Sequence, residues 1–187
     1  LRYVALFLSL LLPALYVAMA TFQQQMLPTK LLLAIIESKQ NVPFPTFLEV
    51  LGLLAAFELL QEAGLHLPQA IGTAVSIIGG LVVGTAAVEA NLVWPAALIV
   101  AATAGICGFT LPSRDLSDAL RIWRFLFTFL AGFAGLFGLT AGALLLLIHL
   151  AGLSSLGVAY LVPFSDARAW RAILRPRLAR QKNRDPD

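Results

Sequence analysis

Long runs without a charged residue alternate with short polar segments along the chain. Residues 3–29, 67–88 and 90–113 contain no Asp, Glu, Lys or Arg. Residues 125–165 also lack these four residue types, and their one titratable histidine is His149. A membrane-spanning helix needs about 20 consecutive apolar residues. The pattern therefore predicts an all-α, polytopic membrane protein with about four spanning helices. We place these helices near 2–22, 69–90, 93–112 and 122–152.

A further apolar segment, near 44–66, carries three carboxylates and no cation. Its VPFP start favours an extended chain followed by a helix, and Gly64 favours the end of that helix. Glu58 and Glu62 lie one turn apart on one helix face, whereas Glu49 lies nearly opposite Glu58. Ionised carboxylates are costly in lipid, so we expect Glu58 and Glu62 to be buried against protein or water. Their expected environment is either a polar cavity or subunit interface, or ion pairs with Arg114, Arg121 or Arg124.

The distribution of cations predicts the topology. Seven of the 13 Lys and Arg residues follow Pro163. Cytoplasmic flanks of membrane helices collect Lys and Arg, so this tail is expected in the cytoplasm, and Arg2 suggests the same for the front. Two cytoplasmic ends require an even number of crossings. We therefore expect the helix near 44–66 to be re-entrant or interfacial, a transmembrane domain over 1–163 and a basic cytoplasmic tail over 164–187.

A ridge of small residues follows one face of the predicted helix at 69–90. Thr73, Ser76, Gly80 and Gly84 belong to this ridge, and Glu89 stands at its end. Small residues allow close helix packing, and they also suit the wall of a pore. Both interpretations remain open for these five residues.

Composition supports the membrane environment and narrows the function. The 187 residues are 59% hydrophobic and only 12% charged, whereas a soluble domain carries roughly 25% charged residues. Mean hydropathy is +0.86. No GxSxG, HExxH, Walker loop or Cys/His metal spacing occurs, so we expect no enzyme, no cofactor, no metal and no nucleic-acid partner. A chain that begins at Leu1 rather than Met also predicts a missing upstream region.

Several segments resemble the membrane region of the GerA spore germination family. They are "LRYVALFLSLLLPALYVAMATFQQQMLPTKLLLAI", "VPFP" with "FELLQEAG", "LPQAIGTAVSIIGGLVVGTAAVEANLV", "TAGICGFTLP" and "SSLGVAYLVPFSD" with a following "RP". They cover nearly the whole chain in the family's order. The chain departs from the usual family residues at Gln25, Gln61, Thr85, Ser155-Leu156 and Val158-Ala159. Thr85 replaces a Gln that would be a natural pore or contact residue.

The resemblance implies the A subunit of a nutrient germinant receptor in the inner membrane of the bacterial endospore. Such a subunit follows a cytosolic N-terminal region and works with a transporter-like B subunit and a lipoprotein C subunit. It also implies a homo-oligomeric ring that releases ions when nutrient binds. Membrane lipids are further expected partners. The alternatives are a non-conducting scaffold subunit and a small secondary transporter, although the chain shows no convincing internal repeat.

Overall fold

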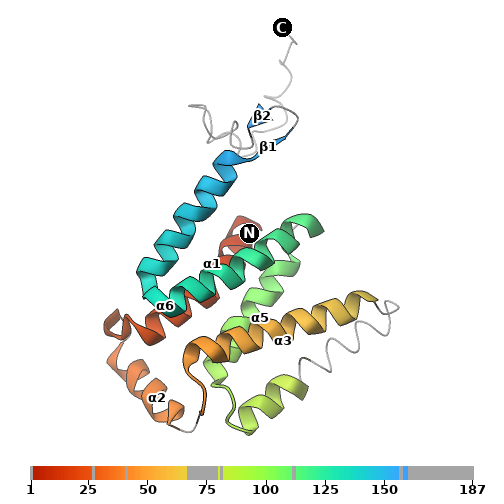
Figure 1. The fold of residues 1–187 in the computed structure, drawn as a ribbon. Coiled ribbons are helices and arrows are strands. Elements are labelled where there is room, and N and C mark those ends of the chain that lie inside the picture. The colour runs from red at the N-terminus through yellow and green to blue at the C-terminus, as the bar shows by residue number, and fades with distance from the viewer. Residues whose placement is uncertain are drawn as a thin grey trace, which may run out of the picture. The chain divides into compact units, whose positions relative to one another are not determined.

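The computed structural model describes residues 2–26, 28–40, 42–66, 80, 82–110, 113–155 and 158–159. These residues are almost entirely helical, as the sequence predicts, apart from one short antiparallel strand pair. The helices are α1 Arg2–Thr21, η1 Gln24–Met26, α2 Thr29–Lys39, α3 Thr46–His66, α5 Pro95–Phe109 and α6 Arg114–Gly152, and the strands are β1 Ser154–Ser155 and β2 Val158–Ala159 (Figure 1). The predicted basic tail lies outside the described residues.

Two of the described helices are long and apolar enough to cross a membrane. They are α1 and residues 115–152 of α6, and the apolar stretch of α5 at 95–108 is shorter. By contacts the chain divides into two compact units, Leu1–Ala143 and Leu144–Asp187. All packing between helices described below lies within the first unit.

Local sequence explains where several helices begin and end. The Ser113 hydroxyl accepts the backbone N–H of Leu116 at 3.4 Å, which caps the start of α6. The helix at 82–89 ends where Asn91 adopts φ 52°, a left-handed conformation that Asn tolerates. There the N–H of Leu92 bonds the carbonyl of Ala87 at 2.9 Å, as in a Schellman motif. The next helix, α5, then begins with a proline at its first position, where no N–H is needed.

Helices α1 and α5 pack together and run in opposite directions. Near one end of the pair, the rings of Tyr16 and Trp94 stack with centroids 6.4 Å apart. Near the other end, a Cβ on Gly108 would lie 3.6 Å from the Ser9 hydroxyl. Since Tyr16 comes late in α1 and Trp94 immediately precedes α5, the two helices are antiparallel.

Helix α3 packs beside α1 and α5 and runs parallel to α5. The Glu49 carboxylate, near the start of α3, accepts the backbone N–H of Trp94. Twelve residues later, the side chain of Gln61 lies 3.6 Å from the position of a Cβ on Gly105. A helix of 21 residues is about 31 Å long. We call the two ends of this bundle the Glu49 end and the Glu58 end. Helix α3, predicted to be re-entrant or interfacial, packs into the core with α1 and α5 and is not among the described helices that are long and apolar enough to cross a membrane.

Helix α6 is broken within its length. Gly135 has φ 60° and ψ −138°, which are not helical angles, so α6 consists of a first arm at 114–134 and a second arm that begins at Leu136. The first arm starts at the Glu58 end, where Arg124 contacts Glu58. It reaches the Glu49 end, where Gly132 lies against the ring of Phe47. The sequence predicted one long final helix, from about 122; α6 begins earlier, at Arg114, and bends sharply at a glycine.

The core of the bundle is apolar and joins α1, α3 and α5. Close approach is possible because α5 contributes alanines that are completely buried. The cluster consists of Val17, Val50, Leu53, Leu54, Ala97 and Ala101.

The carboxylate of Glu49 joins three further segments beside this core. Its residue is only 2% exposed. One oxygen accepts the N–H of Trp94, and the other lies 3.8 Å from the ammonium nitrogen of Lys39, at the end of α2. Burial lowers the pKa of Lys39 below its usual value, and the neighbouring Glu49 opposes this shift. The backbone N–H and the nearby ammonium offset the cost of burying this carboxylate.

We expect Glu49→Ala to destabilise the bundle, because it leaves a half-buried ammonium and a buried N–H without their acceptor. Breaking such a buried pair costs about 3–5 kcal/mol. Thermal unfolding of the purified protein in detergent, followed by circular dichroism, measures the effect. Glu37→Ala is the matched control because Glu37 is exposed on α2, and it should shift stability by no more than about 0.5 kcal/mol. Equal losses in the two variants would contradict the structural role of Glu49.

Candidate functional site

An ionic cluster connects α3 to the first arm of α6. Both oxygens of Glu58 are engaged, one by the guanidinium of Arg124 and the other by Arg121 Nε at 2.7 Å. Arg121 also lies 3.6 Å from Glu62 and 3.2 Å from Asp118. The cluster therefore contains three carboxylates and two guanidinium groups. Of the two environments expected for Glu58 and Glu62, the structure contains the ion pairs.

Burial separates the two glutamates that the sequence placed on one face. The Glu58 side chain is 13% exposed, and its partner Arg124 is 6% exposed. The Glu62 side chain is 54% exposed, although it lies only one turn away. Two of the three predicted arginine partners are thus found in the cluster, and the side chain of Arg114 lies outside the described part of the chain. Asp118, which the sequence does not predict as a partner, is an additional member, three residues before Arg121 on the same helix.

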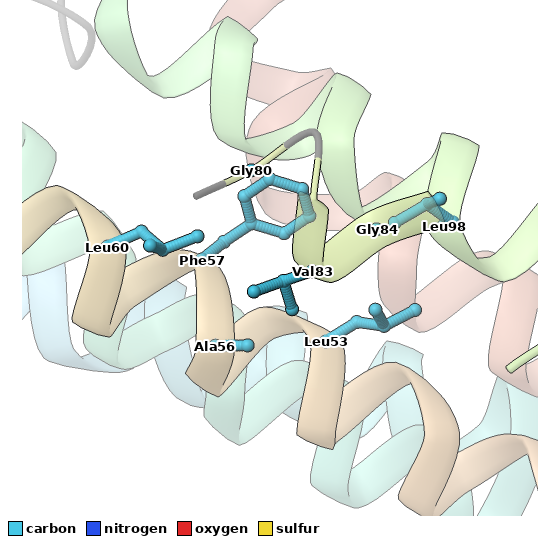
Figure 2. A pocket seen from close by; sticks show the side chains of 8 residues that line it. All are labelled: Leu53, Ala56, Phe57, Leu60, Gly80, Val83, Gly84 and Leu98. Carbon is cyan, nitrogen blue, oxygen red and sulfur yellow. The ribbon is translucent and has the colours of Figure 1, made fainter. Parts of the chain in front are cut away.

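The end of the predicted small-residue ridge packs inside the chain. A Cβ on Gly84 would lie 3.4 and 3.5 Å from the methyl groups of Leu98 on α5, whereas the position of a Cβ on Gly80 is open. Both glycines border a small apolar pocket between 80–84, α3 and α5 (Figure 2). Its lining residues are Leu53, Ala56, Phe57, Leu60, Gly80, Val83, Gly84 and Leu98. Thr73 and Ser76, the other predicted members, lie outside the described residues.

The opposite face of the helix at 82–89 points away from this packing. Val82 is 56% exposed, and Thr85, Ala86 and Glu89 are exposed as well. Their spacing of three, four and seven residues places all four on one helix face. We call Val82, Thr85, Ala86 and Glu89 the outer face of this helix. It ends in a carboxylate and otherwise presents small or branched side chains.

The chemistry available in the described residues is ionic and steric. Among these residues, no three His, Cys, Asp or Glu side chains gather in a way that could hold a metal ion. Cys107 is a free thiol of intermediate burial. The fold and site thus define a helical protein with membrane-type helices, an internal ion-pair cluster and an outward-facing helix that ends in Glu89.

Comparison with known proteins identifies the family. The chain matches the Bacillus/Clostridium GerA spore germination protein family over residues 1–186, and it belongs to this family. It is 44% identical over 161 residues to the uncharacterized membrane protein YfkQ of Bacillus subtilis (strain 168), covering 86% of this chain and 31% of that protein. It is 43% identical over 178 residues to spore germination protein KA of the same organism, covering 94% of this chain and 33% of that protein.

Other members show similar likeness. Spore germination protein GerLA of Bacillus cereus is 38% identical over 160 residues, which cover 86% of this chain and 32% of that protein. The chain therefore spans about a third of the length of these relatives. No solved structure matches it. The resemblance inferred from sequence segments is confirmed at the level of the family.

The two glutamates of the cluster offer a matched pair for mutation. We expect Glu58→Ala to lower the free energy of unfolding by about 3–5 kcal/mol, because Arg124 is left buried without its carboxylate. Glu62→Ala removes a largely exposed ion pair, which is worth about 0.2–1 kcal/mol. Thermal unfolding in detergent measures both variants. If the two variants lose the same stability, the ion pairs of Glu58 do not hold α3 to α6.

Proposed function

We propose that this chain is the membrane region of an A subunit of a spore nutrient germinant receptor. Membership of the GerA family carries the proposal, and the names of the relatives support a role in germination. The subunit works in the inner membrane of the endospore with B and C subunits and contacts membrane lipids. It carries out no enzymatic reaction. Binding of a nutrient to the complex changes the state of this membrane region.

We further propose that several copies surround an axis and form an ion channel. Each copy contributes the helix at 82–89, with its outer face toward the axis. Glu89 would then form a ring of carboxylates at one mouth, which attracts cations and repels anions. Val82, one to two turns away, would form the apolar constriction. Opening would need only a few kcal/mol of bias from a partner that has bound nutrient.

The packing of the ridge changes which side chains we assign to the pore. The sequence favours packing over pore lining for Gly80 and Gly84, and the channel alternative turns their face toward the axis. The contact of Gly84 with Leu98 supports packing on that side. The exposure of Val82 and Glu89 supports the outer face as the wall. For Thr73 and Ser76, lining or packing stays a prediction.

A non-conducting scaffold is the second candidate. The observation that favours it is the same close packing of Gly84 on α5, because small residues that pack helices need no pore. In a scaffold, several copies would still assemble, but the charge at Glu89 would have no effect on ion movement. A secondary transporter ranks below both because the sequence shows no internal repeat. Ion flux with a charge-reversal variant separates the scaffold from the channel.

The directions of the described helices affect how many membrane crossings we propose. The predicted four crossings do not count α3, whereas its packing beside α1 and α5 supports a further crossing by this helix. Among the described helices, α1, α3, α5 and the first arm of α6 each run between the Glu49 end and the Glu58 end, and the chain between α3 and α5 returns from one end to the other. Two cytoplasmic ends, as the cations require, then need one more traverse after the first arm. We therefore propose six traverses in place of four spans and a re-entrant helix.

The channel is tested by Glu89→Lys. Liposomes loaded with K⁺ carry the full-length protein with its B and C subunits, and a mixture of amino acids and sugars is added as germinant. We expect the unsubstituted complex to release K⁺, and the variant to release it at least tenfold more slowly or to pass anions instead. The physical reason is that a ring of cations repels K⁺ at the mouth.

Assembly of each complex is checked by size-exclusion chromatography before flux is measured. Glu37→Lys makes the same charge change at an exposed position on α2 and should leave K⁺ release unchanged. Unchanged K⁺ release in an assembled Glu89→Lys complex would refute the channel in favour of the scaffold. An assembled, unsubstituted complex that releases no K⁺ would also refute the channel.

Labelling of single cysteines with a membrane-impermeant maleimide tests the topology. The positions are Gln40, Asn91 and Ser113, which are all exposed. Six traverses place Gln40 and Asn91 on one side of the membrane and Ser113 on the other. Four spans with a re-entrant helix place Gln40 and Ser113 together, with Asn91 opposite. Labelling in intact cells and after permeabilisation distinguishes the two patterns.

A further inference from the structure

The break in α6 falls in a glycine-rich segment. Proline is absent from residues 113–155, whereas glycines at 132, 135, 138 and 142 lower the helix propensity around the break. The angles of Gly135, φ 60° and ψ −138°, lie in a region that only glycine adopts readily. The glycines permit the break, and contacts with other segments show what holds it.

The end of α1 fills the space at the break. A Cβ on Gly135 would lie 2.8 Å from the Cβ of Phe22 and 2.8 Å from Gln23 Oε1. The backbone N–H groups of Phe22 and Gln23 both bond the carbonyl of Ala18, at 3.0 and 3.1 Å, so this turn is fixed to the last turn of α1. A displacement of the end of α1 would thus change the contacts of Gly135 directly.

Gln23 also satisfies a backbone group that the break exposes. In a continuous helix the N–H of Leu136 would bond the carbonyl four residues earlier. At the break, the amide oxygen of Gln23 accepts this N–H at 3.3 Å. An unpaired backbone N–H in an apolar environment is strongly disfavoured. The side chain of Gln23 therefore replaces the hydrogen bond that the helix loses.

The chain beyond the break folds back on the first arm. A Cβ on Gly142 would lie 3.2 Å from a methyl of Leu130 and 3.3 Å from the ring of Phe127. In a straight helix, residues 127 and 142 would be about 22 Å apart. Gly138 lies against the backbone carbonyl of Leu130. The glycines at 138 and 142 thus allow the two arms to approach closely.

We propose that Gly135 is a hinge and that Gln23 is the latch that holds it. When Gln23 bonds the N–H of Leu136, the two arms of α6 are held at a sharp angle. When the end of α1 moves and this bond is lost, the angle opens, because the N–H of Leu136 regains an acceptor within the chain by bonding the carbonyl four residues earlier in a continuous helix. The latch is a single neutral hydrogen bond, so a modest displacement of α1 suffices to release it. This device couples α1 to the second arm whether or not the protein conducts ions.

Distances between spin labels test the hinge. Labels are placed at Ile122 and Thr140, which are exposed on the two arms, in the full-length protein in lipid nanodiscs, with Cys107 replaced by Ser. A straight helix would separate the two backbone positions by about 27 Å. We expect a clearly shorter mean distance in the unsubstituted protein, and a longer, broader distribution in Gln23→Leu, which cannot accept the N–H.

Three further variants identify the cause of any change. Gln23→Glu keeps an acceptor and should retain the short distance. Gln24→Leu is the matched control, since the Gln24 side chain donates to the Ala20 carbonyl of its own segment, at 3.0 Å. Gly135→Ala should lengthen the distance because its Cβ cannot fit beside Phe22 and Gln23. Each variant is first shown to elute as the folded protein.

Two results would overturn the proposal. The first is a distance near that of a straight helix in the unsubstituted protein, which would remove the hinge. The second is an unchanged distance in both Gln23→Leu and Gly135→Ala, which would show that neither residue controls the angle. If Gln23→Leu does not fold, Gly135→Ala and the unsubstituted protein still decide, because each has a defined expected distance.

Discussion

The arrangement of the bundle depends on satisfying a few polar groups in an apolar interior. Glu49 is the clearest case, because its carboxylate is almost completely buried and bonds the N–H of Trp94 while it faces Lys39. A carboxylate in such a place is tolerable only with donors around it. Its position therefore fixes the start of α5 beside the start of α3, and the stacking of Tyr16 on Trp94 aligns α1 with both. Together with the contacts of Gly105 with Gln61 and of Gly108 with Ser9 at the other end, these contacts define the parallel and antiparallel directions of the helices.

The Glu58 cluster performs the same task at the other end of α3. Glu49 and Glu58 are separated by nine residues, about 14 Å along a helix, and they bond to different elements. One carboxylate joins α3 to α2 and α5, whereas the other joins it to the first arm of α6. Polar groups inside a membrane region are expected to pair with one another in this way. Glu49 and Glu58 of α3 thus act as connectors, whereas Glu89 lies on an exposed helix face.

Glycines have three different roles in this chain, and spacing alone does not distinguish them. Gly84 allows a helix to approach Leu98, Gly132 accommodates the ring of Phe47, and Gly135 takes backbone angles that other residues avoid. Glycines recur at regular spacing in both the 69–90 segment and α6, and this spacing is the same kind of pattern in the two places. The role of each glycine depends on which atoms pack against its Cα. These atoms belong to segments distant in the sequence, such as Phe47 and the turn at Phe22.

The sequence by itself determined the helical class, most helix positions and the family, because hydrophobic runs, prolines and caps act locally and the family motifs are contiguous. It also named Arg121 and Arg124 as possible partners of Glu58, since few cations are available in so apolar a chain. Only the tertiary structure decided that Glu58 is buried and Glu62 largely exposed, that α3 lies within the bundle, and that α6 breaks at Gly135. The physical reason is that burial, helix direction and the break all depend on contacts between residues up to 113 positions apart, such as Gln23 with Leu136, and no local pattern records such contacts.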